Sequence, residues 1–117
     1  MRILTLATTS LLSFAVAHAA YAHAFLDHAE PRVGSKIPTA PKEVVLSFTQ
    51  KLEPAFSSIE VSDANGVRVD QGKPNVSATA MRVGVKPLPP GTYRVRWQVL
   101  SVDTHTTEGN FTFTVGP

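Results

Sequence analysis

Three residues of this chain have side chains and positions suited to holding a metal ion. Asp103 and His105 are two residues apart, and positions i and i+2 of an extended segment project to the same side. A carboxylate and an imidazole with this spacing can meet one ion, although the same pattern is common in solvated loops without function. The third residue, His23, owes its interest to its place in the chain.

His23 directly follows Ala20-Tyr21-Ala22, a small-x-small pattern typical of signal-peptidase cleavage. Residues 1–22 predict a secretory signal, because Arg2 is followed by an apolar stretch and then by small residues. That stretch is shorter than the roughly 20 residues that span a bilayer, which argues against a membrane anchor. Ala17-His18-Ala19 is a competing cleavage site that would leave His23 internal, and the pattern alone does not choose between the two.

Cleavage before His23 would create a chelating group, because an N-terminal histidine offers both its α-amine and its imidazole Nδ1. If His23 lies near Asp103 and His105, the set becomes three nitrogens and one oxygen. Such donors in a tetragonal plane suit Cu(II) better than other divalent first-row ions. A free α-amine titrates near pH ~7.7–8, so affinity should fall as the pH drops below neutral.

The elements that must position these residues are strands. Apolar and polar residues alternate in several short runs, which is typical of strands with one buried face, and no convincing apolar stripe has helical spacing. The apolar members are Val44, Leu46 and Phe48; Ile59 and Val61; Val67 and Val69; Met81, Val83 and Val85; Tyr93, Val95, Trp97 and Val99; Phe111, Phe113 and Val115. With a strand near residues 24–29, the pattern predicts an all-β, immunoglobulin-like antiparallel sandwich of about seven strands.

Two local features refine this prediction. Ala64-Asn65-Gly66 predicts a hairpin turn, because Asn-Gly tolerates positive φ. Trp97 is interpreted as a core anchor between the sheets, and the polar stretch 101–110 as a loop between the last two strands.

Composition limits the classes of function. Residues 23–117 make one small domain with one core. The chain has 11 basic and 9 acidic residues, and this near-neutral balance favours neither nucleic acid nor an anionic membrane as partner. It has no cysteine, so an exported domain of this size depends on packing alone, and thiolate is not available as a metal ligand.

The residues also resemble a known family. The similarity to the CopC family of periplasmic copper-binding proteins covers nearly all of residues 23–117, in the same order, and it favours cleavage before His23. It is carried by His23-Ala24-Phe25-Leu26 with Pro31, Leu46-Ser47-Phe48-Thr49-Gln50, Pro90-Gly91-Thr92-Tyr93-Arg94-Val95-Arg96-Trp97, Ser101-Val102-Asp103-Thr104-His105 and Gly109-Asn110-Phe111-Thr112-Phe113.

This resemblance implies a periplasmic, non-enzymatic protein that binds one Cu(II) per chain through the amine and ring of His23, His105 and Asp103. It implies a role in copper resistance, carriage or homeostasis, often beside an inner-membrane partner of the CopD type.

The chain departs from the family pattern at two places. Gln50 stands where some members have a glutamate near the copper, so an additional oxygen ligand there is in doubt. Members that bind Cu(I) have a Met-rich loop, whereas residues 23–117 keep only Met81, on a predicted strand face. Because soft thioether ligands are missing, we expect no Cu(I) site. His28 is interpreted as a surface histidine, and Glu108 as a loop residue that in a second reading supports His105.

Two other classes of function stay open on the sequence. One is an oxidative enzyme with a copper histidine brace, although Asp103 as an additional ligand would fill a position that oxygen activation needs. The other is a metal-free, immunoglobulin-like assembly module.

Overall fold

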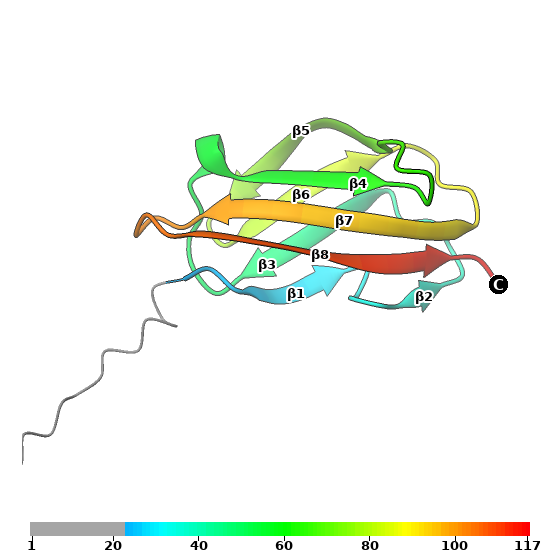
Figure 1. Cartoon of the computed structure of the whole chain (residues 1–117), viewed down its shortest axis with the longest axis horizontal. Coiled ribbons are helices and arrows are strands. Elements are labelled where there is room, and N and C mark those ends of the chain that lie inside the picture. The colour runs from blue at the N-terminus through cyan, green and yellow to red at the C-terminus, as the bar shows by residue number, and fades with distance from the viewer. Residues whose placement is uncertain (1–22) are drawn as a thin grey trace, which may run out of the picture.

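The computed structural model describes residues 23–117, so the predicted signal segment 1–22 lies outside the described residues. This part of the chain folds into eight strands and a short 3-10 helix at Pro54–Phe56 (Figure 1). The strands are β1 (Leu26–Glu30), β2 (Lys36–Ile37), β3 (Glu43–Phe48), β4 (Ser58–Ser62), β5 (Asp70–Ser77), β6 (Ala80–Val85), β7 (Gly91–Leu100) and β8 (Thr106–Val115). None of the helices in residues 23–117 is long and apolar enough to cross a membrane.

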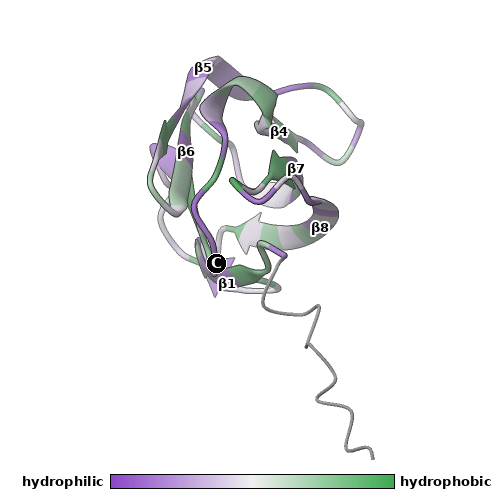
Figure 2. Cartoon of the chain, turned by 90° about the vertical axis from the view of Figure 1, so that its left-hand side faces the viewer, coloured by the Kyte–Doolittle hydropathy of each residue, from purple (hydrophilic) through white to green (hydrophobic). Residues whose placement is uncertain are grey.

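The strands form two four-stranded sheets, in the orders β1-β3-β6-β5 and β2-β8-β7-β4. All pairings are antiparallel except that of the two-residue β2 with β8. Viewed from one end, the sheets lie face to face, with β5 and β6 on one side and β4, β7 and β8 on the other (Figure 2). The predicted sandwich is therefore confirmed, with eight strands in place of about seven.

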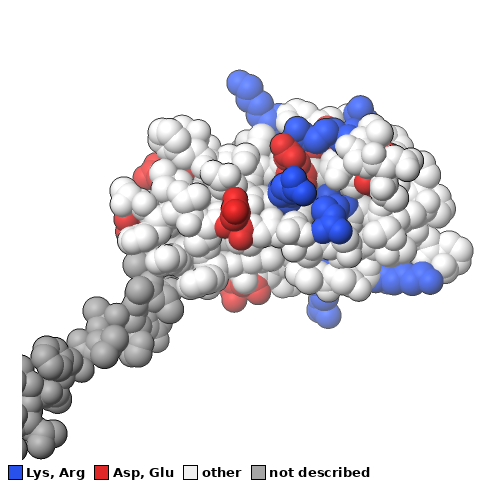
Figure 3. Space-filling model, in the orientation of Figure 1, with Lys and Arg blue, Asp and Glu red and all other residues white. Residues whose placement is uncertain are grey.

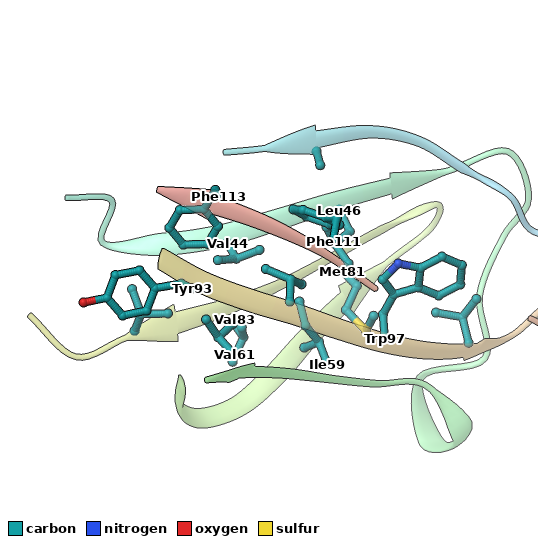
Figure 4. Close-up of a cluster of buried hydrophobic side chains, with 14 of the residues drawn as sticks. Val44, Leu46, Ile59, Val61, Met81, Val83, Tyr93, Trp97, Phe111 and Phe113 are labelled. Carbon is teal, nitrogen blue, oxygen red and sulfur yellow. The ribbon is translucent and has the colours of Figure 1, made fainter. Parts of the chain in front are cut away.

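The apolar members of the alternating runs form the core between the sheets (Figure 4), except that Val67 is exposed and Val69 is only partly buried. The long strand β7 shows the pattern most clearly, since Tyr93, Val95, Trp97 and Val99 are buried while the residues between them are exposed. Trp97 meets Phe48 of the other sheet edge-on, with 5.1 Å between ring centroids. The interpretation of Trp97 as an inter-sheet anchor is confirmed.

The region after β4 differs from the prediction. The turn at Ala64-Asn65-Gly66 is present, and Gly66 has the positive φ (82°) that this turn requires. The return strand predicted from Val67 and Val69 is wrong: only one isolated bridge, between Ser62 and Arg68, pairs it with β4. The chain crosses instead to the other sheet, where it forms β5.

The polar stretch 101–110 also differs from the predicted loop. Only residues 101–105 connect the last two strands, because β8 begins at Thr106 and pairs with β7 in continuous register as far as Leu100. Gly109 lies directly opposite Trp97 in this pairing. A Cβ at Gly109 would lie 2.6 Å from the indole ring, so the absence of a side chain lets the ring lie over the strand.

Candidate metal centre

The candidate metal residues meet at one end of the sandwich, at the left of Figure 1, where the chain enters β1 and where β7 turns into β8. Residues 101–105, which connect β7 to β8, form a tight turn. The Thr104 N–H donates to the Ser101 carbonyl (2.9 Å) and the Ser101 N–H donates to the His105 carbonyl (3.0 Å). Thr104 adopts a positive φ of 74°. The loop is braced from the other sheet, since the Val102 N–H donates to the carbonyl of Lys51, shortly after β3.

His23 and His105 lie side by side. Their rings stack with 4.6 Å between centroids and an interplanar angle of 22°. The ring of Phe25 also stacks on that of His23, with 5.9 Å between ring centroids. His23 is half-buried and the side chain of His105 is 47% exposed, so both imidazoles stay accessible to an ion from solvent.

Asp103 belongs to the same cluster. Its Oδ1 lies 3.4 Å from Nδ1 of His105 and accepts a hydrogen bond from the Ser101 hydroxyl. The Ser101 hydrogen bond, followed by the interaction with His105, lowers the pKa of Asp103 below its usual value. The carboxylate thus stays in its charged form beside the His105 ring, as binding of a cation requires.

On one face of the molecule, the charge visible at this end is acidic (Figure 3). At the left-hand end of the face shown in Figure 3, acidic atoms appear and basic atoms do not; the basic side chains gather farther along, over the β4–β7 region.

Side chains alone do not complete a metal site. Across residues 23–117, no group of three or more His, Cys, Asp and Glu side chains has a geometry that could hold an ion. The structure places the His23 ring and the Asp103 carboxylate each next to His105, but these three described side chains do not form such a group as they stand.

Two other candidate residues, His28 and Glu108, lie on strands and not in the turn that carries Asp103 and His105. His28 is on β1, where its Nε2 lies 3.0 Å from Glu30. Glu108 is on β8 opposite Gln98. Within residues 23–117 it makes no hydrogen bond to His105. Gln50 follows β3 and is half-buried.

Three residues that sequence reasoning missed support the cluster. Ser101 is fully buried and its hydroxyl reaches Asp103 and the His105 backbone. The hydroxyls of Thr49 and Thr107 bind the backbone of residues 23–25. No sequence signal points to Ser101, because residues 101–105 form a tight turn in which side chains do not alternate as they do in a strand.

Comparison with known proteins identifies the family. Residues 26–116 match the model of the CopC domain. The chain belongs to the CopC family. It is 34% identical to copper resistance protein C of Escherichia coli over 92% of each chain. It is also 33% identical to the copper transport protein CutJ of Bacillus subtilis, matching 82% of this chain but 18% of CutJ.

Solved CopC structures have the same fold. CopC of Methylosinus trichosporium OB3b superposes with a TM-score of 0.72 and 36% identity, over 81% of this chain and 95% of that one. PcoC of Escherichia coli, described as a methionine-rich copper resistance protein, gives 0.71 and 33%, over 80% and 98%. These members of the family are named as copper resistance or copper transport proteins, not as enzymes.

Proposed function

We propose that the chain is exported to the periplasm, loses residues 1–22 and binds one Cu(II) ion through the new α-amine and ring of His23, with His105 and Asp103. Residues 23–117 remain after cleavage as the functional domain, which carries or buffers copper. The observation that supports this most is the 4.6 Å stacking of His23 on His105, since these residues are far apart in the chain.

The chemistry of the donors fits Cu(II). An imidazole nitrogen binds a metal at roughly 2 Å, so two rings this close can share one ion after modest rotation of their side chains. The described side chains alone form no group that could hold an ion, and cleavage before His23 would add a further nitrogen as an amine. Three nitrogens and one carboxylate oxygen then match the tetragonal preference of Cu(II).

Asp103 contributes to the proposed site in two ways. Its carboxylate provides the oxygen donor and the negative charge. Its contact with Nδ1 of His105 also favours the tautomer in which Nε2 of that ring is free for the ion, as carboxylates beside metal-binding histidines do.

The proposed site is specific for the oxidised ion. Met81 is completely buried in the core, so its thioether cannot reach the His23–His105 end without unfolding of β6. Soft Cu(I) prefers thioether and thiolate ligands, and residues 23–117 offer neither at the surface.

We further propose that copper passes to or from an inner-membrane partner of the CopD type. The match to CutJ supports this, because a chain named as a copper transport protein contains a segment like this one within a much longer sequence.

The decisive test changes the amine and keeps every side chain. We expect the protein starting at His23 to bind one Cu(II), and a version with one alanine added before His23 to bind much more weakly. The loss should exceed the ~10–100-fold that removal of an outer-shell partner costs. His105→Ala should lose a similar amount, and affinity is measured by competition with a chelator of known strength.

His28→Ala is the matched control, because it removes a histidine that pairs with Glu30 on β1. It should bind copper like the parent. Undiminished binding by the extended version would rule out the amine as a ligand, and no binding by the parent would refute the copper site altogether.

A further inference from the structure

A chelating N-terminus must be held still, yet the first residues of a domain usually fray unless they are tied down. In this protein the leading segment, His23–Phe25, is fixed from both sheets. Ala24 contributes a fully buried methyl group to the core. Two threonine side chains supply hydrogen bonds to the backbone of the segment.

Thr49 makes three hydrogen bonds to the leading segment. Its hydroxyl accepts from the Phe25 N–H (2.9 Å) and donates to the His23 carbonyl (3.2 Å). Its own N–H donates to the Phe25 carbonyl (2.9 Å). Thr49 directly follows β3, so the segment is joined to the sheet that contains β1.

Thr107 holds the segment from the opposite sheet. It is half-buried on β8, and its hydroxyl donates to the Ala24 carbonyl at 2.6 Å, across 83 residues of sequence. Thr107 comes two residues after His105, so the strand that anchors the segment is the strand that begins beside the second candidate ligand.

Both hydroxyls bind carbonyl or amide groups of the backbone and not the His23 ring. The ring and the position of the future amine are therefore left for another partner, while the backbone that carries them is fixed on two sides. Without these bonds, Cu(II) binding would have to order the segment, and the lost conformational freedom would weaken affinity.

We propose that Thr49 and Thr107 are positioning residues that hold His23–Phe25 in the orientation that presents the His23 nitrogens to His105. This inference rests on the proposed Cu(II) site, and it assigns to two hydroxyl groups the preorganisation of that site.

The test uses the protein starting at His23 and the variants Thr49→Val, Thr107→Val and both together. Valine keeps the β-branched shape and removes the hydroxyl. In the metal-free protein, Thr49→Val should speed hydrogen exchange of the Phe25 N–H, which loses its acceptor. Each single change should weaken Cu(II) binding by about 10-fold and the pair by about 100-fold, the range seen for outer-shell partners. The electron paramagnetic resonance spectrum of bound Cu(II) should also broaden or shift.

Thr112→Val, on β8 with its side chain half-buried, is the control and should change none of these readouts. The inference is overturned if the double variant keeps the parent's affinity and spectrum, even if its melting temperature falls, because the threonines would then be structural only. It is also overturned if exchange at Phe25 is unchanged in Thr49→Val. If the parent binds no Cu(II), the proposed function fails, and the exchange rates still decide whether the threonines hold the segment.

Discussion

Asp70 is a largely buried carboxylate that the surrounding backbone and side chains hold by hydrogen bonds. It begins β5, its side chain is 8% exposed, and its Oδ1 accepts from the Val61 N–H at 2.9 Å and Arg68 Nε at 2.8 Å. Burial alone would raise the pKa of Asp70, but the hydrogen bonds from Arg68 and Val61 and the charge of Arg68 outweigh it and lower the pKa. The carboxylate therefore fastens the crossing from β4 to β5.

Asp70→Asn should destabilise the protein by about 1–2 kcal/mol at pH 7, because charge-assisted hydrogen bonds are lost. A lowered pKa contributes stability above the unfolded value of about 3.9, and this contribution disappears as the pH falls through the lower folded value. Urea unfolding of the parent and of Asp70→Asn should therefore give different free energies of unfolding at pH 7. This difference should shrink toward zero below about pH 3. Glu60→Gln is the control, because the Glu60 side chain also contacts Arg68 but is 48% exposed. This substitution should change the free energy of unfolding little at either pH. An equal loss in both variants would contradict this assignment.

The ligand candidates could be predicted from the sequence because histidine and aspartate are few and their chemistry is distinctive. Ser101, Thr49 and Thr107 could not, because their roles depend on backbone groups that only the fold brings near. Thr107 meets a carbonyl 83 residues away, and nothing in its local pattern separates it from the other threonines of β8.

At the scale of elements, the β7–β8 hairpin carries the Asp103–His105 loop at its tip, and Gly109 leaves room on it for the Trp97 ring. Gly109→Ala would place a Cβ 2.6 Å from the Trp97 ring, so we expect a loss of about 1–3 kcal/mol, typical of overpacking. Gly84→Ala on β6 is the matched control, because its nearest neighbour would be 3.6 Å away. Thermal unfolding of both variants checks the prediction, and a loss confined to Gly84→Ala would refute it.

Alternating strands could be predicted because one face of each is buried, as in β3, β4, β6 and β7. Strand β5 could not, because it is a polar edge strand with Gly72 and Pro74 in its middle, and both residues normally argue against a strand. The start of β8 could not be predicted either, because residues 106–110 are polar. They gain their extended form from pairing with β7.

At the scale of the whole molecule, the core is complete without metal, since both sheets contribute buried residues along their length. Copper should therefore stabilise the fold by mass action and not create it. At free Cu(II) about 100 times the Kd, the gain should be about 2.7 kcal/mol, or about 10–20 °C in Tm for a domain of this size. Differential scanning calorimetry of the protein starting at His23 checks this, with His105→Ala expected to show a smaller rise. Loss of β-sheet circular dichroism after chelation would contradict it.

The meeting of the leading segment with the β7–β8 loop has a topological consequence. An ion held between them would join two points about eighty residues apart and close most of the domain into a ring, as a disulfide does in many small domains. Such a link restricts the unfolded chain most when the ring is long. This chain has no cysteine, and its cross-link would be reversible: made when copper arrives and opened when acid or a stronger chelator removes it.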